Sequence, residues 1–405
     1  MLLSKKKFFL LSSLLMLALP VAYASNAKRD SYPSSKNLVE VLSTSVNSFF
    51  PHAVISNRKK PVYHFVRSSL TIDPQRISYS FRGRPKTVAA MLKETHTDAL
   101  IVLKNGQLVY EKYYTHSPSF SHPLYSVTKS LTALVATILI NEGVLKRDEL
   151  ITHYLPELSR SAYKGATVEN LLEQTVGVDF NEDYLNPFSD IYRFMLKAFA
   201  PGSAGLRTSL TTLKQAGEHG KKFHYVSPNI DTLCWVIEKA SRQTFPQLLE
   251  ERIWSKLGMS YDASIRTDVK NVAFCGGGMR AAAIDIAKVG QVILDNGYFD
   301  HRQVIAKKVV RDIKKGGDPK LFAEGGAVLI PHRLESYQDE FWHTGNKNHA
   351  FYARGVFGQW LYIDPTTKVV IVKLSSQILP RSELILEKTL GGLEAISENL
   401  QNQSK

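Results

Sequence analysis

Ser126-Val127-Thr128-Lys129 places a hydroxyl and an amine three residues apart at the head of a long apolar run, residues 131–140. Residues three apart on a helix lie on the same face, so the two side chains can meet. A serine is a poor nucleophile unless a neighbouring base takes its proton. Burial lowers the pKa of a lysine, which would let a partly desolvated Lys129 act as that base. The spacing therefore predicts a serine–lysine catalytic pair at the start of a helix.

The spacing alone is not specific, because S-x-x-K occurs five times, at Ser4, Ser25, Ser56, Ser126 and Ser161. Only Ser126 follows a strand pair and a polar loop and opens a long apolar helix. The alternative for Ser126 is a serine near a helix N-cap, followed by a solvated lysine.

The first 24 residues have the pattern of a secretory signal. Lys5-Lys6-Lys7 is basic, residues 8–19 are apolar, and Ala22-Tyr23-Ala24 is a small-x-small cleavage site. No other run of eighteen apolar residues exists, so no integral membrane helix is expected. We expect a periplasmic or secreted protein that begins near Ser25.

The formal net charge is +14, and loss of the three signal lysines leaves +11. Such a charge allows weak contact with an anionic envelope surface, although a well-solvated surface is the simpler explanation. No basic stripe is interleaved with aromatic residues, so no nucleic-acid partner is predicted.

Cys234 and Cys275 are the two cysteines of the chain. In an exported protein they can pair, and two buried free thiols fit their apolar and glycine-rich surroundings equally well. Neither lies in a CxxC motif, HExxH is absent, and the twelve histidines lack metal-ligand spacing. We therefore expect no metal and no organic cofactor.

Residues 25–85 are polar and irregular, which indicates an N-terminal extension that either wraps a core or stays mobile. The core begins with two β-rich runs on either side of Asn105-Gly106, a strong hairpin signal. Helical periodicity then dominates residues 120–320, approximately, before strands return.

This order predicts an α/β (α+β) fold for residues 86–400. Its antiparallel sheet would come from about 95–118 and 322–378, flanked by helices, with an all-α lobe inserted at about 120–320. The cleft between sheet and lobe is the natural site.

A serine–lysine pair needs a second proton carrier and an oxyanion hole. Tyr225 is the candidate carrier, because a tyrosine near an ammonium can have a lowered pKa and accept the serine proton. Ser227, two residues on, is placed to hydrogen-bond Lys129 or a substrate amide. The alternative for Tyr225 is a half-buried core tyrosine.

Four segments together resemble the serine hydrolases with the class C β-lactamase fold. Within them the resemblance is to the 6-aminohexanoate-dimer hydrolase and family VIII esterase branch, over residues 85–378, approximately. The segments occur in the family's order and are Ser126-Val127-Thr128-Lys129-Ser130, Gly177-Val178-Asp179-Phe180-Asn181-Glu182-Asp183-Tyr184, Tyr225-Val226-Ser227-Pro228-Asn229-Ile230-Asp231, and Gly355-Val356-Phe357-Gly358-Gln359-Trp360-Leu361-Tyr362-Ile363-Asp364-Pro365.

The resemblance implies a role for each matched residue. Ser126 would form the acyl-enzyme, and Lys129 would take or hold its proton. Tyr225 would carry the proton to the leaving group and later activate water. Tyr184 would contact the leaving amine, and the backbone N–H of Ser126 would be one oxyanion donor.

The chain departs from the family at the third motif, Lys-Thr-Gly, for which two segments compete. His343-Thr344-Gly345 is closer by letter, whereas Ala353-Arg354-Gly355 lies at the better distance from the turn at Asp364-Pro365. We favour the second, which makes the N–H of Val356 the other oxyanion donor. Gly355 then belongs to the substrate-binding strand, and Arg354 becomes a candidate ligand for a substrate carboxylate.

Ser227 stands where class C β-lactamases have asparagine, so efficient β-lactam hydrolysis is not expected. No G-x-S-x-G elbow is present, which disfavours an α/β-hydrolase. We predict an exported serine hydrolase that acts on a small-molecule amide or ester, or on a peptide. The alternatives are a D-Ala-D-Ala carboxypeptidase of the penicillin-binding type and a catalytically silent relative that binds envelope polymers.

Overall fold

A computed structural model describes residues 51–58, 61–326 and 333–403. The signal segment and the first part of the predicted extension lie outside these residues. The strands are β1 (His52–Ile55), β2 (Ser78–Phe81), β3 (Arg84–Thr87), β4 (Thr97–Lys104), β5 (Gln107–Tyr113), β6 (His122–Pro123), β7 (Ala263–Arg266), β8 (Met279–Ala281), β9 (Tyr298–Phe299), β10 (Arg302–Gln303), β11 (Ser336–Gln338), β12 (Phe341–His343), β13 (Phe351–Gly355), β14 (Gln359–Asp364) and β15 (Val369–Ser375).

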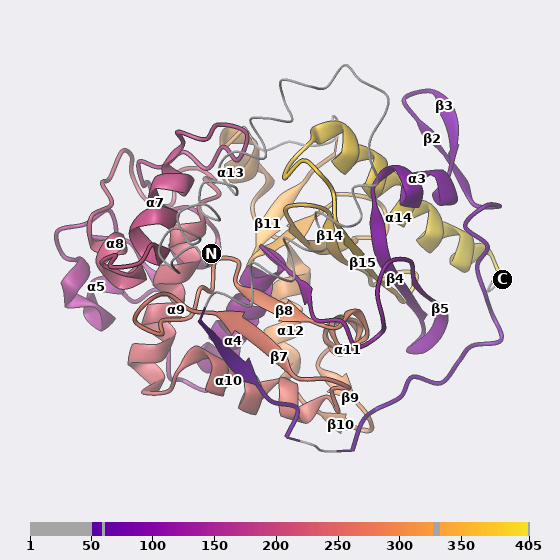
Figure 1. The fold of residues 1–405 in the computed structure, drawn as a ribbon, viewed down its shortest axis with the longest axis horizontal. Helices are drawn as coiled ribbons and strands as arrows, with labels where there is room; N and C mark the ends of the chain where they lie inside the picture. Colours follow the sequence, from indigo (N-terminus) through magenta and orange to yellow (C-terminus); the bar gives the residue numbers. More distant parts are fainter. Residues whose placement is uncertain (1–50, 59–60, 327–332, 404–405) are drawn as a thin grey trace, which may run out of the picture.

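The α-helices are α3 (Val88–Glu94), α4 (Val127–Asn141), α5 (Ile151–Tyr154), α6 (Val168–Leu172), α7 (Asp190–Phe199), α8 (Leu206–Thr211), α9 (Ser227–Ser241), α10 (Phe245–Arg252), α11 (Ala283–Leu294), α12 (Lys307–Lys315), α13 (Pro319–Glu324) and α14 (Glu383–Asn402). Short 3-10 helices lie at Pro156–Leu158 and Trp254–Lys256. Figure 1 shows two sides, with α5, α7, α8 and α9 on one and the large sheet with α14 on the other.

The large sheet joins strands from both ends of the chain in the order β11-β12-β13-β14-β15-β4-β5, and every neighbouring pair is antiparallel. Its central strands alternate between two apolar cores. Ala99, Ile101 and Leu103 belong to one core, while Leu100 and Val102 belong to the other. Since successive side chains of a strand point to opposite faces, helices must cover both faces. The predicted antiparallel sheet, flanked by helices, is confirmed.

Both faces are covered, by helices far apart in the sequence. α11 packs on β15, β4 and β14, and α14 and α3 pack together on the opposite face. A Cβ placed on Gly290 of α11 would lie 2.5 Å from Val370 Cγ1 and 2.7 Å from Leu361 Cδ1, so the helix approaches the sheet closely. The structure thus places α11 against the large sheet, although its residues fall within the range predicted for the all-α lobe.

α4 runs through the interior and explains the uninterrupted apolar run after the S-x-x-K segment. Its residues from Val127 to Leu139 are all buried, and it packs on α9, α10 and α12. A helix that is apolar all round is a buried helix. The segment that carries Ser126 and Lys129 is therefore the start of a core helix.

A second sheet, in the order β1-β7-β8-β6, lies beside the start of α4. β1 pairs with β7, so the described part of the predicted N-terminal extension contributes a strand to the core. β6 ends three residues before Ser126 and pairs with β8. In the described ranges no helix is both long enough and apolar enough to cross a membrane.

The close approach at Gly290 yields a stability prediction. Gly290→Ala gains about 1 kcal/mol of helix propensity at most, but overpacking against Val370 and Leu361 costs about 1–3 kcal/mol. We expect a net loss of about 1–2 kcal/mol in the free energy of unfolding, measured by urea denaturation. Gly217→Ala is the control, because a Cβ there meets nothing within 4 Å. Equal stability of the two variants would contradict the close packing.

Candidate functional site

Ser126 is the N-cap residue of α4, directly before its first turn, and its hydroxyl caps no backbone N–H. Its side chain makes no capping hydrogen bond, and Tyr125 before it adopts a left-handed backbone with φ 46°. The N–H of Leu124 donates to the carbonyl of Met279 at 2.9 Å, which fixes the approach of the chain to this turn. Ser126 thus stands at the N-cap position, as the alternative had it, but its side chain makes no capping hydrogen bond.

Lys129 is buried and points at Ser126. Lys129 is 1 % exposed, and its Nζ donates to Ser126 Oγ at 2.8 Å. The same Nζ donates to the carbonyl oxygen of Gly276. The alternative of a solvated lysine is wrong, and the sequence-predicted pair is brought together.

Tyr225 adds a third polar atom to the pair. The centre of the Tyr225 ring lies 5.1 Å from Lys129 Nζ, close enough for the charge of each group to shift the pKa of the other. The ring packs against Trp342 at 5.5 Å and Tyr337 at 6.2 Å. Tyr225 is thus half-buried, as the alternative had it, but its hydroxyl lies at the Ser126–Lys129 pair.

The protonation of Lys129 differs from the expectation that burial would make it a base. Burial does lower its pKa, but the negative charges of Tyr225 and two carboxylates, Glu182 and Glu340, outweigh burial and leave the pKa above its ordinary value. Burial also raises the pKa of Tyr225, and the Lys129 ammonium opposes that rise only in part. Lys129 therefore stays protonated, and the base form of the Lys129–Tyr225 pair is scarce at neutral pH.

The end of β13 lies against the backbone of Ser126. A Cβ on Gly355 would lie 3.1 Å from the Ser126 nitrogen and would also collide with the Leu124 carbonyl, so only glycine fits. Val356 follows directly. Gly345 instead lies against the backbone of Leu334. Of the two competing segments, the structure brings residues 353–355 to Ser126, as favoured.

Glu182 connects two predicted substrate-binding residues and was missed by the sequence analysis. It accepts from Tyr184 Oη at 2.8 Å, from Ser227 Oγ at 2.6 Å and from the Ser227 backbone nitrogen at 2.5 Å. The Ser227 hydroxyl thus donates to Glu182 and not to Lys129, contrary to one option given above. Carboxylates in loops are common, so only the position of Glu182 two residues before Tyr184 offered a signal.

Arg354 lies over the Trp342 ring, with its guanidinium carbon 4.0 Å from the ring centre. The neighbouring charge is that of Arg381, and the phenols of Tyr352 and Tyr225 are close. Within the described ranges Arg354 forms no ion pair with a carboxylate. Its side chain therefore lies on the face of β13 that Tyr225 packs against. There its positive charge is available to bind an anion.

Two further buried carboxyl groups surround the pair. Burial raises the pKa of Glu340 to about 8 and that of Asp231 to about 7. Glu340 accepts from Tyr337 Oη at 2.5 Å, and Asp231 accepts from the Gly276 nitrogen at 2.8 Å. Both lie on segments remote from Ser126, which is why sequence spacing did not indicate them.

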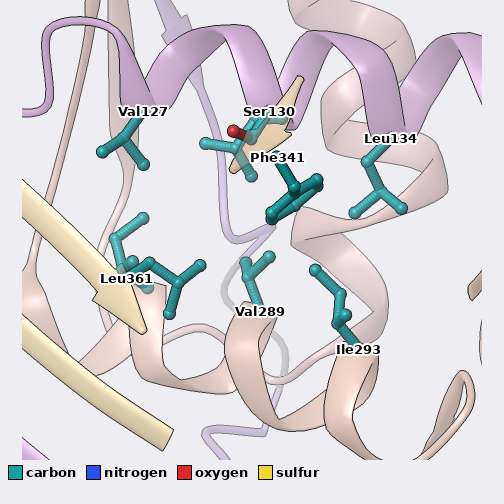
Figure 2. A pocket seen from close by; sticks show the side chains of 9 residues that line it. Val127, Ser130, Leu134, Val289, Ile293, Phe341 and Leu361 are labelled. Carbon is teal, nitrogen blue, oxygen red and sulfur yellow. The ribbon is translucent and has the colours of Figure 1, made fainter. Parts of the chain in front are cut away.

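An apolar packing space lies deeper in the core and is separate from this site. Figure 2 shows it between α4, α11 and the sheet, with Val127, Leu134, Val289 and Phe341 among its lining residues. It is too narrow to admit water. As far as the described residues go, no three His, Cys, Asp or Glu side chains group as metal ligands.

The sequence matches known proteins over most of its length. The Beta-lactamase family model matches residues 86–388. A 6-aminohexanoate-dimer hydrolase of Paenarthrobacter ureafaciens is 35% identical over 298 residues, which cover 70% of this chain and 74% of that protein.

Solved structures give the same picture. A Bacillus anthracis protein assigned as a 6-aminohexanoate-dimer hydrolase matches with a TM-score of 0.81 at 25% identity, over 92% of this chain and 99% of that one. A family VIII carboxylesterase matches in fold, with a TM-score of 0.58 at 15% identity, over 76% and 95% of the two chains. The predicted resemblance and the β-lactamase/transpeptidase-like fold are confirmed.

The contact of Gly355 with Ser126 can be tested with a fluorophosphonate, which reacts only with an activated serine. Gly355→Ala should displace the Ser126 backbone nitrogen and slow labelling by about 100-fold, the effect of losing one oxyanion donor. Gly217→Ala should label at the wild-type rate, since its added Cβ lies in open space. Wild-type labelling of Gly355→Ala would contradict this arrangement.

Proposed function

The chain belongs to the Beta-lactamase family, and on that premise we propose that it is an exported serine hydrolase that cleaves an amide or ester through an acyl-enzyme on Ser126. The observation that carries the proposal is the 2.8 Å hydrogen bond from Lys129 Nζ to Ser126 Oγ, made inside the core. A buried ammonium aimed at a serine hydroxyl has no structural need that a neutral side chain would not meet better.

In the proposed reaction Tyr225 accepts the hydroxyl proton of Ser126 while Ser126 Oγ bonds to the substrate carbonyl carbon. The raised pKa of Lys129 favours the role of holding charge over that of taking the proton, so its ammonium stabilises the Tyr225 phenolate. The backbone N–H groups of Ser126 and Val356 donate to the developing oxyanion. Tyr225 then gives the proton to the leaving group, and water later releases the acyl group with Tyr225 as its base.

The substrate class follows from the walls of the site. Arg354 offers a cation to a carboxylate at one end of a substrate, and Tyr184, whose hydroxyl donates to Glu182, is the proposed contact for the leaving group. A short linear amide with a free carboxylate fits this pair of contacts. The 35% identical 6-aminohexanoate-dimer hydrolase makes that dimer the first amide to assay.

Export is proposed from two independent features. Residues 1–24 have the pattern of a secretory signal, and Cys234 and Cys275 are joined in a disulfide. Structural disulfides persist in oxidising compartments outside the cytoplasm. Of the two states left open for the cysteines, the paired one is present.

Hydrolysis of a short-chain p-nitrophenyl ester tests the nucleophile. Ser126→Ala should reduce kcat by more than about 1000-fold, because the reaction loses its covalent step. Ser161→Ala is the matched control, since Ser161 also begins an S-x-x-K segment but its hydroxyl donates to the Leu158 carbonyl at 2.8 Å. Equal rates for wild type and Ser126→Ala would end the proposal and favour a silent binder of envelope polymers.

The same variants separate the proposal from the D-Ala-D-Ala carboxypeptidase alternative. We expect turnover of 6-aminohexanoate dimer or simple esters without a stable penicillin adduct. A lasting penicillin adduct at Ser126, with release of D-alanine from a cell-wall peptide, would favour the alternative.

The protonation of the Lys129–Tyr225 pair predicts a pH profile. Both pKa values are raised, so the base form is a minority at neutral pH and grows about tenfold for each pH unit below those pKa values. The logarithm of kcat/KM should therefore rise with a slope near +1 between about pH 7 and 9, after subtraction of the Ser126→Ala background. A plateau already reached below pH 7 would contradict the raised values.

A further inference from the structure

The Cys234–Cys275 disulfide lies next to Gly276, whose carbonyl binds Lys129. It joins the middle of α9 to the segment before β8, with 6.1 Å between the two Cα atoms. Cys275 immediately precedes Gly276, and the Gly276 carbonyl accepts a hydrogen bond from Lys129 Nζ. The disulfide is therefore one residue away from an atom that holds the lysine.

Gly276 is also held by a second residue of α9, Asp231. Asp231 lies three residues before Cys234, so the two side chains share a helix face. Asp231 accepts from the Gly276 nitrogen at 2.8 Å. A Cβ on Gly276 would lie 3.1 Å from Asp231 Oδ2 and 3.2 Å from the Ser227 carbonyl oxygen, so Gly276 fits tightly against the start of α9.

Lys129 depends on this carbonyl because few acceptors reach it in the core. In the described part of the chain its ammonium donates to Ser126 Oγ and Gly276 O, with the Tyr225 ring beside it. The titratable groups that face it are Tyr225, Glu182, Glu340 and Asp231. Loss of one acceptor from a buried ammonium destabilises the charged form and frees the side chain to turn away from Ser126.

We propose that the Cys234–Cys275 disulfide is a positioning element for Lys129, which makes the activity depend on the oxidation state of the two cysteines. It acts by fixing the Gly276 carbonyl, and it rests on the catalytic role proposed for Lys129. Reduction by a dithiol such as dithiothreitol transfers two electrons and two protons to the disulfide, giving two thiols and the cyclic oxidised dithiol. The Cys275–Gly276 segment then loses its covalent link to α9 and keeps the hydrogen bond from the Gly276 nitrogen to Asp231.

Burial determines how the inference must be tested. Cys234 is 2 % exposed and Cys275 is fully buried, so a reductant reaches the bond poorly in the folded protein. The double variant Cys234→Ala/Cys275→Ala removes the bond without a reductant. Dithiothreitol at a low urea concentration, followed by reoxidation, provides a reversible version on the unchanged sequence, with free thiols counted in each state.

In both versions kcat for the p-nitrophenyl ester should fall by about 10–100-fold, the effect of misplacing a reacting group by an ångström or so, with KM nearly constant. Because a displaced or neutral Lys129 no longer stabilises the Tyr225 phenolate, the rise of kcat/KM with pH should also move to higher pH. Reoxidation should restore both. Gly276→Ala, which keeps the disulfide but crowds Asp231, should change kcat and the pH profile in the same direction.

An unchanged kcat and pH profile in the folded double variant would overturn the inference. A lower kcat with a lower urea midpoint but an unmoved pH profile would overturn it too, because that result assigns the bond a purely structural role. Ser126→Ala, run in parallel, separates the two proposals. If wild-type activity requires Ser126 but not the disulfide, only this inference fails, whereas activity independent of Ser126 removes the proposed function itself.

Discussion

The site depends on one buried cation. Lys129 carries an ammonium group into the protein interior, where an unpaired charge would be strongly destabilising. Its hydrogen bonds to Ser126 Oγ and the Gly276 carbonyl, with Tyr225 beside it, replace the lost water. Three segments far apart in the sequence must therefore converge on one nitrogen atom, and the fold can be understood as the scaffold that makes them converge.

Close backbone approach makes that convergence possible. β13 reaches the Ser126 backbone because position 355 has no side chain, and the segment before β8 fits against the start of α9 because position 276 has none. α9 then serves both sides of the site, since its first turn places Ser227 on Glu182 and its next turns hold Gly276 through Asp231 and Cys234. The Glu182 loop and the Gly276 carbonyl that binds Lys129 are thus both held by one helix.

The sequence correctly predicted the features that depend on residues close to one another in the chain. The Asn105-Gly106 hairpin, the buried α4 and the meeting of Ser126 with Lys129 depend on residues near one another in sequence, and they are found as expected. The second sheet was missed because strands of two to four residues carry too little periodicity to detect. Glu182 was missed because a loop carboxylate carries no signal of its distant partners. The sign of the Lys129 pKa shift was wrong for the same reason, since the carboxylates that reverse the effect of burial come from other segments.

The central claim is that Ser126 carries the acyl group during turnover. Intact-mass spectrometry after rapid acid quench of the protein with a slowly released p-nitrophenyl ester tests it most directly. The account predicts an increase equal to one acyl group, mapped to the peptide that contains Ser126, and no adduct in Ser126→Ala. Turnover with no covalent adduct at any time, or an adduct mapped to another residue, would contradict it.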